Sequence, residues 1–158
     1  MERNQYLSSR LREVFLNGTW IANTNYQDQL SQTSWEEANF KIGNLNTIGN
    51  LTFHINYYLE GLLSAFNTGQ LTIRDQFSYD DTPVTSAEDW DQRITQFLNN
   101  AEDFAAAVAQ FNDAVFDEDF IDAKYGTYLR NIEGVIEHSY YHLGQIVLLK
   151  KLIASTTK

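Results

Sequence analysis

Apolar side chains return every three or four residues along most of this chain, and no other feature limits its fold as strongly. The clearest run continues for more than twenty residues: Trp90, Ile94, Phe97, Ala101, Phe104, Val108 and Phe111. Residues three and four apart share one face of an α-helix, so this spacing predicts an amphipathic helix over about residues 87–110. No segment shows the alternation of apolar and polar residues that is typical of strands. The fold is therefore predicted to be all-α.

Three further segments show the same spacing. The first predicts a helix over about residues 2–26. The second begins at Ser34, which precedes Glu37 by three residues in the pattern of a capping box, and continues to Gly69. The last covers about residues 132–153. Four helices of three turns or more predict a four-helix bundle with long second and fourth helices.

The predicted helices are separated by three polar or irregular segments. Residues 27–33 form a short link, so the first two helices are expected to be antiparallel neighbours. Residues 70–85 lose the periodicity and contain the only proline, Pro83, and residues 112–126 are acidic, aromatic and irregular. A chain of 158 residues is long enough to bury one core, and we expect a single domain over residues 1–158.

Charge and composition limit the partners that the chain can have. The chain has 21 acidic against 11 basic residues, a formal net charge of -10, which repels phosphate backbones and anionic lipid. Nucleic-acid and membrane partners are therefore not expected. The segment Met1–Tyr6 lacks the apolar core of a signal peptide, so a cytoplasmic location is expected. Without cysteine, a transition-metal site must use imidazole, carboxylate and water.

The three histidines of the chain form the best candidate for a functional site. His138 and His142 are four apart, the spacing at which two imidazoles on one helical face can reach one metal ion, and His54 lies in a polar stripe of the second predicted helix. If the two stripes face each other, three imidazoles converge and leave coordination positions open. Ser139 follows His138, so the glutamate base of a zincin motif is absent. The alternative is that these are ordinary surface or hydrogen-bonded histidines.

Four polar residues lie on or near the same two stripes and are predicted to line a substrate pocket: Asn50, Tyr58, Tyr141 and Gln145. Tyrosine and glutamine could orient a small-molecule substrate or bond to the free nitrogen of an imidazole. The alternative is that the tyrosine rings simply pack, with their hydroxyls in water. Glycine costs about 1 kcal/mol relative to alanine inside a helix. Five glycines lie within the predicted helices, and some of them are expected to allow close approach of helices or to leave room beside the site: Gly43, Gly49, Gly61, Gly134 and Gly144.

Two segments, Asn46–Tyr58 and Ile136–Ile146, resemble the DinB-like superfamily of small bacterial four-helix proteins. In that family a histidine of the second helix and an H-x-x-x-H pair of the last helix, followed by Gly-Gln-Ile, bind a divalent metal. The resemblance covers nearly the whole chain and implies that His54, His138 and His142 are metal ligands, with zinc or nickel as the expected ion.

The resemblance leaves several functions open. Some members are S-transferases or isomerases that use a low-molecular-weight thiol such as bacillithiol or mycothiol, which implies such a thiol as a cosubstrate. A metal-dependent enzyme that activates a thiol or water, of the S-transferase or hydrolase type, is the first hypothesis. The second is a non-catalytic metal-binding or structural module, and the third is an interaction protein without a working site. A homodimer is expected from the family.

Overall fold

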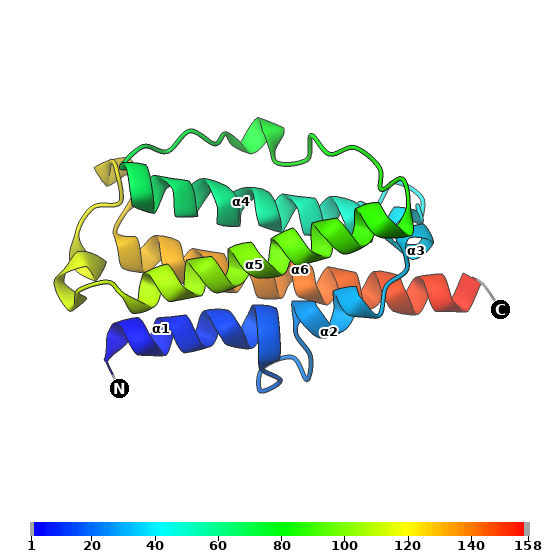
Figure 1. Ribbon diagram of the computed structural model, residues 1–158, viewed down its shortest axis with the longest axis horizontal. Helices are drawn as coiled ribbons and strands as arrows, with labels where there is room; N and C mark the ends of the chain where they lie inside the picture. The colour runs from blue at the N-terminus through cyan, green and yellow to red at the C-terminus, as the bar shows by residue number, and fades with distance from the viewer. Residues whose placement is uncertain (1, 157–158) are drawn as a thin grey trace.

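The computed structural model describes residues 2–156, and within them the main structural elements are α-helices. Four of these lie side by side as a bundle, and two are short helices in the connection between the first and second members of the bundle (Figure 1). In chain order they are α1 (Arg3–Arg12), α2 (Tyr26–Ser31), α3 (Trp35–Asn39), α4 (Ile48–Thr68), α5 (Ala87–Ala109) and α6 (Tyr128–Thr156). The structure confirms the predicted all-α bundle. None of the helices in residues 2–156 combines the length and apolar character needed to cross a membrane.

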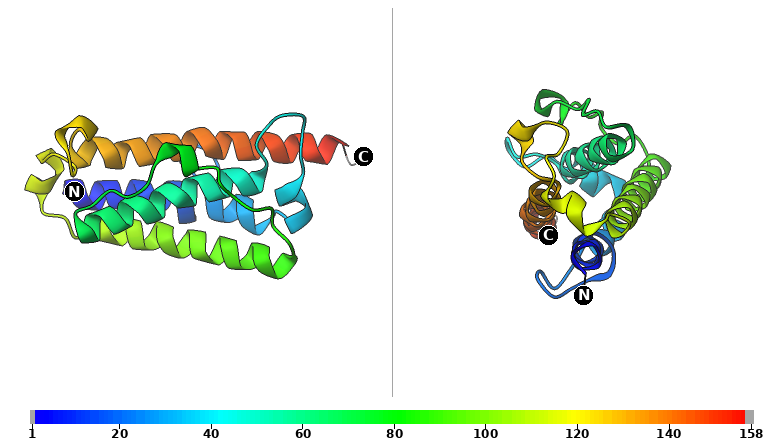
Figure 2. Two further views of the ribbon diagram at one scale, coloured as in Figure 1. Left: turned by 90° about the horizontal axis from the view of Figure 1, so that it is seen from above. Right: turned by 90° about the vertical axis from the view of Figure 1, so that its left-hand side faces the viewer.

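The four bundle helices are not arranged around the bundle in chain order. Helices α1 and α6 run in one direction, and α4 and α5 run in the other (Figure 1). Helix α5 packs against α1 and α4, whereas α6 packs against α4 and α1, so that α1 and α4 lie on a diagonal (Figure 2). The expectation that the first two long helices are neighbours is therefore wrong. The connection between them is not the short link that was expected, because it includes α2, α3 and three loops, and it is long enough to cross the bundle.

The first predicted helix is interrupted well before residue 26. Helix α1 continues as a π-helical turn over Glu13–Asn17, and the chain leaves the helix at Gly18. A Cβ atom at Gly18 would lie 2.2 Å from Cγ of Glu13, so only glycine lets the chain fold back against this turn. The apolar spacing continues past the break, which is why the prediction over residues 2–26 is wrong in its second half.

A short helix replaces most of the link predicted over residues 27–33. The side chain of Asn25 accepts a hydrogen bond from the backbone N–H of Asp28 and so caps the start of α2. Tyr26 is fully buried, and its hydroxyl donates a hydrogen bond of 2.9 Å to the backbone oxygen of Ser139. Helix α2 thus supports the middle of α6, the region that carries two of the three histidines.

The second predicted helix is split in two. The predicted capping box of Ser34 and Glu37 is confirmed, but it starts only the five-residue helix α3. The chain then passes through Gly43, whose φ of 51° is left-handed, so this glycine lies in a loop rather than in a helix as predicted. A second capping box, made by Thr47 and Asn50, begins α4. Each box satisfies two of the free N–H groups at its own helix start, which stabilises the new start after the interruption.

The third and fourth predicted helices are confirmed as α5 and α6. The two segments predicted as loops contain short 3₁₀ turns at Asp75–Phe77, Asp113–Asp117 and Ala123–Tyr125, and the second also contains Asp119, which forms an isolated β-bridge with Thr127. The first segment, residues 69–86, runs back along the outside of α4 so that α5 can start at the same end of the bundle as α4 (Figure 1). We call residues 69–86 the crossover segment.

The core lies between the bundle helices and holds α4 and α6 in a fixed relation. Ile55 and Leu59 of α4 and Leu143 and Ile146 of α6 are each at most 2% exposed. Burial of side chains of this size contributes about 1.5–3 kcal/mol each. The two helices that carry the histidines are therefore tied together by apolar packing that does not depend on the histidines.

Candidate metal centre

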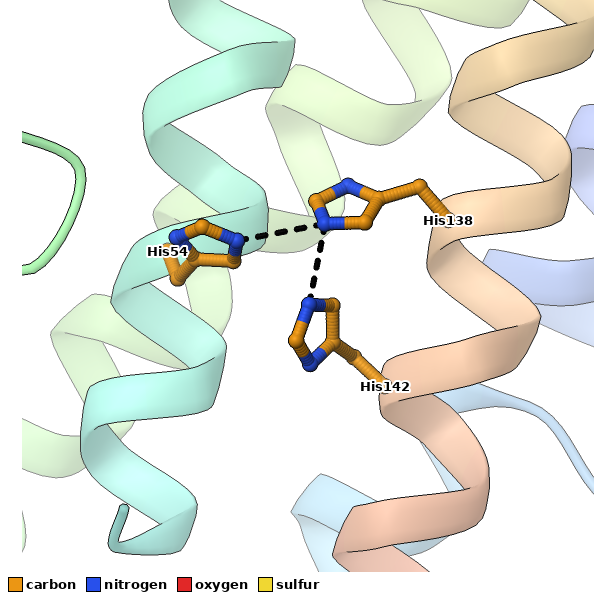
Figure 3. A group of neighbouring side chains, drawn as sticks. All are labelled: His54, His138 and His142. Atoms are coloured by element: carbon orange, nitrogen blue, oxygen red, sulfur yellow. Dashed lines mark hydrogen bonds between the residues drawn. The ribbon is translucent and has the colours of Figure 1, made fainter. Parts of the chain in front are cut away.

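The three histidines meet between α4 and α6. His54 projects from α4, and His138 and His142 project from successive turns of α6 toward it (Figure 3). The Nε2 atom of His138 lies 3.2 Å from Nε2 of His54 and 2.9 Å from Nε2 of His142. The candidate ligand atoms all lie within 4.8 Å of one another. His54 and His142 are buried, at 6% and 5% exposure, and His138 is partly buried. The structure brings together the three residues that the spacing singled out.

Two of the imidazoles are held in one tautomer by oxygen atoms. Nδ1 of His54 lies 3.1 Å from the backbone oxygen of Ser78, and Nδ1 of His142 lies 2.7 Å from Oε1 of Gln145. Because these oxygens can only accept, each Nδ1 carries the hydrogen, and each neutral ring presents a lone pair at Nε2. This is the tautomer in which a histidine binds a metal through Nε2.

The facing nitrogens form an incomplete hydrogen-bonding arrangement. Nε2 of His138 lies close to both other Nε2 atoms, and its one hydrogen could satisfy only one of their two lone pairs. A divalent cation would instead accept a lone pair from all three nitrogens. The three Nε2 atoms are therefore satisfied better by a metal ion than by hydrogen bonds among the imidazoles.

The environment keeps the three rings neutral. Burial lowers the pKa of His54, of His138 and of His142 below the ordinary value of histidine. The effect is largest at His138, whose pKa falls to about 4 because burial is reinforced by the neighbouring rings of His142 and His54. A neutral imidazole is the form that binds a metal, so no proton has to be displaced near pH 7.

The crossover segment completes one side of the site. Ser78 is buried and supplies the backbone oxygen that orients His54, and the ring of Tyr79 stacks on the His54 ring with centroids 4.1 Å apart. The segment comes close to α4 because Gly61 has no side chain: a Cβ atom there would lie 2.3 Å from Cγ2 of Ile73. This confirms the expectation that Gly61 allows close approach. No periodic pattern in the sequence links residues 73–79 to His54.

The far end of the crossover segment is anchored by two polar contacts. The side chain of Asn39 both donates to the backbone oxygen of Val84 and accepts from its N–H, at 2.6 and 3.0 Å. Arg93 of α5 forms a 2.9 Å ion pair with Asp81, whose carboxylate is only 5% exposed. These contacts hold the segment against α3 and α5, which fixes the position of Ser78 relative to α4.

Three of the four predicted pocket residues contact the histidines, and two of them, Gln145 and Tyr141, lie on α6 beside His142. Gln145 is the acceptor for Nδ1 of His142, the role that glutamine was expected to fill at an imidazole. Tyr141 is 64% exposed, and its ring meets the His142 ring edge-on with centroids 4.8 Å apart. Tyr141 thus lies on the solvent side of the site.

The other two predicted pocket residues differ in their placement. The ring of Tyr58 lies edge-on to His54, with centroids 5.1 Å apart, and its hydroxyl donates to Oδ1 of Asp75 at 3.0 Å. The Asn50 side chain accepts a hydrogen bond from the N–H of Thr47 in the capping box of α4, and among residues 2–156 it forms no other hydrogen bond. Asn50 thus has a structural role at the start of α4. Contact of these four residues with a substrate stays a prediction.

A cavity of about 580 Å³ adjoins His138 on the side of Tyr58. Its remaining walls come from α4, the crossover segment, the loop before α6 and the first half of α6. They include Leu62, Arg74 and Arg130, which were not predicted as pocket residues from the sequence. Gly134 also lines it, and no atom lies within 4 Å of the position a Cβ would take there. Gly134 therefore leaves room beside the site, as expected. A larger hollow of about 720 Å³ lies on the polar face of α5, and no histidine lines it.

The fold and the site define a class of protein: an all-α bundle in which three histidines from two antiparallel helices could hold a metal ion. Residues 22–146, which include all three histidines, match the family model of the DinB superfamily. The chain belongs to this superfamily. No curated protein and no solved structure matches it significantly.

Proposed function

We propose that this protein is a metal-dependent enzyme in which His54, His138 and His142 hold a divalent ion, zinc or nickel. The observation that carries the proposal is the convergence of the three Nε2 atoms, two of them held in the metal-binding tautomer by Ser78 and Gln145. The reaction class that we favour is transfer to or from a thiol, or hydrolysis.

The number of ligands supports catalysis rather than a purely structural role. Structural zinc sites use four protein ligands, whereas catalytic sites use three and keep one position for water or substrate. In the described part of the chain, no fourth histidine or carboxylate joins the group. When bound, a divalent ion lowers the pKa of a coordinated thiol or water and so supplies a nucleophile near neutral pH.

The chain's own residues supply orientation and a place for the substrate. Ser78 and Gln145 hold two rings so that their lone pairs stay directed at one point. The cavity beside His138 is the space from which a small molecule could reach that point. Because the chain has no cysteine, the thiol of a transferase reaction would come from a small-molecule cosubstrate.

The first test is the metal content of the untagged protein, measured by mass spectrometry. We expect close to one zinc or nickel per chain in the wild type, and loss of that metal in a His138→Ala, His142→Ala variant purified identically. The matched control is Glu133→Ala, Glu137→Ala, which removes two exposed carboxylates at the same helical spacing on α6. The control should retain the metal. Absence of metal from the wild type, even after incubation with zinc and with nickel, would refute the proposal.

Activity separates the enzyme from the non-catalytic alternative. Metal-loaded protein should accelerate either the reaction of a small thiol with an electrophile or the hydrolysis of an activated ester, and the double histidine variant should not. Full metal occupancy without turnover on either substrate class would favour the binding or structural module. The homodimer expected from the family stays a prediction, which sedimentation velocity of the untagged protein would test.

A further inference from the structure

We propose that the cavity beside His138 binds a carboxylate group of the substrate or cosubstrate through Arg74 and Arg130. Carboxylate binding itself requires only the cavity and the two arginines. That the other end of the bound molecule reacts at the histidines rests on the proposed function. The ligand is thus an organic monoanion with a short apolar body, whose other end approaches the histidines.

The two arginines are held less firmly than the arginines that form ion pairs elsewhere in the fold. Three of the six arginines form ion pairs elsewhere in the fold: Arg3, Arg12 and Arg93. The guanidinium of Arg74, in contrast, has no hydrogen-bond or ion-pair partner among residues 2–156, although its backbone is held by the Tyr57 hydroxyl. Arg130 has only Glu137, at 3.3 Å, and both side chains are about two thirds exposed. Such a pair contributes little and exchanges readily.

The charge of the cavity matches one carboxylate. Arg74 and Arg130 contribute two positive charges, and Asp75, whose Oδ1 accepts from the Tyr58 hydroxyl, contributes one negative charge. Among the residues that line the cavity the sum is one positive charge, which a monoanion neutralises, and Glu137, the exposed partner of Arg130, lies outside the lining. Guanidinium groups bind carboxylates with two parallel hydrogen bonds, and these are stronger than bonds between neutral groups. A phosphate dianion would exceed the charge of the cavity and would meet Asp75.

The rest of the cavity is suited to an apolar body. Leu62, Ile73 and Val135 contribute apolar wall, and Gly134 leaves open the volume that a side chain would fill. His138 lines the same cavity. A ligand held by its carboxylate at the arginines can therefore extend along apolar side chains toward the imidazoles.

The test compares hexanoate with 1-hexanol, which has the same six-carbon chain but no charge. Binding is followed by backbone amide NMR shifts in chelator-treated, metal-free protein, so that the carboxylate cannot bind to a metal. We expect hexanoate to bind about tenfold more tightly than 1-hexanol, with shifts centred on the residues that line the cavity.

Variants assign that preference to the arginines. The preference should disappear in Arg74→Gln, Arg130→Gln and persist in the control Lys41→Gln, Lys151→Gln, which removes the same charge from two exposed positions that do not line this cavity. Arg74→Lys, Arg130→Lys keeps the charge without the planar fork and should retain part of the preference. Gly134→Leu, which fills the cavity, should weaken both ligands.

Several results would overturn the inference. These are equal binding of hexanoate and 1-hexanol to the wild type, an unchanged preference in the glutamine variant, and hexyl phosphate binding ten times more tightly than hexanoate. If the glutamine variant does not fold, a Gly134→Leu variant that binds hexanoate as the wild type does would overturn it. The proposed function fails separately, because a wild type that takes up no metal can still show the hexanoate preference.

Discussion

Gln145 offers the sharpest test of how the site is organised. Its Oε1 atom lies 2.7 Å from Nδ1 of His142 and holds that ring in the tautomer whose Nε2 lone pair faces the other two imidazoles. Methionine has a similar length and a similar helix propensity but lacks this strong acceptor. In Gln145→Met, Nδ1 of His142 loses its partner, and the ring can place its hydrogen on Nε2 instead. Metal binding through Nε2 must then move this hydrogen back to Nδ1.

Removal of an acceptor behind a metal-binding histidine lowers metal affinity by about 10–100-fold, which corresponds to about 1.4–2.7 kcal/mol. We expect a loss of this size for zinc in Gln145→Met. Gln145→Glu keeps an acceptor and makes it anionic, so its zinc affinity should equal or exceed that of the wild type. The assay is competition between the protein and a chelating dye for zinc at pH 7.5.

The control is Gln92→Met, the same chemical change at an exposed position of α5, and it should leave zinc affinity unchanged. Circular dichroism of the metal-free proteins would show whether all variants keep the fold. A Gln145→Met protein that is folded and binds zinc within twofold of the wild type would refute the tautomer argument. The histidines would then orient themselves without help from Gln145.

Three further predictions follow from the same structure. Zinc at 100 times its dissociation constant should stabilise the protein by about 2.7 kcal/mol, which would be measured as a rise in melting temperature. This rise should be absent in His54→Ala. In urea unfolding, Gly144→Ala should gain about 0.5–1 kcal/mol, because nothing lies within 4 Å of the added Cβ, whereas Gly61→Ala should lose stability, because its Cβ would meet Ile73 at 2.3 Å. Metal-free protein should lose stability as the pH falls from 6.5 toward 4: the pKa of His138 is about 4 in the folded state and 6.5 is its ordinary value, so the unfolded state takes up more protons in this window. The free energy of unfolding, measured by chemical denaturation across this window, should depend less steeply on pH in His138→Ala than in the wild type. An equal pH dependence would contradict the attribution of this effect to His138.

Helices α5 and α6 could be predicted, α5 to within one residue at each end and α6 to within four. The breaks at Gly18 and near Gly43 could not, because apolar residues keep the helical spacing on both sides of each break. Spacing reports which residues would share a face if the backbone were helical. It does not report whether a glycine or a capping box ends the helix, which depends on local backbone contacts.

The order of the helices around the bundle also could not be predicted. The sequence implied a short first link and hence adjacent first and second helices, whereas α1 and α4 lie on a diagonal and the crossover segment makes α4 and α5 parallel neighbours. Which apolar faces pair is decided by packing between segments far apart in the chain. The apolar spacing of a helix shows which face is buried, but it does not show which other helix covers that face.

By itself the sequence determined the helical class of the fold, the shared stripe of His138 and His142, and the place of Gln145 three residues beyond His142. These follow from the regular rotation of an α-helix, which relates residues within one segment. Only the tertiary structure decided that His54 would meet that pair, that Ser78 would orient its ring, and that Arg74 and Arg130 would line one cavity. Those residues come from different segments without a common period, and they meet because burial of the apolar faces places α4, α6 and the crossover segment together.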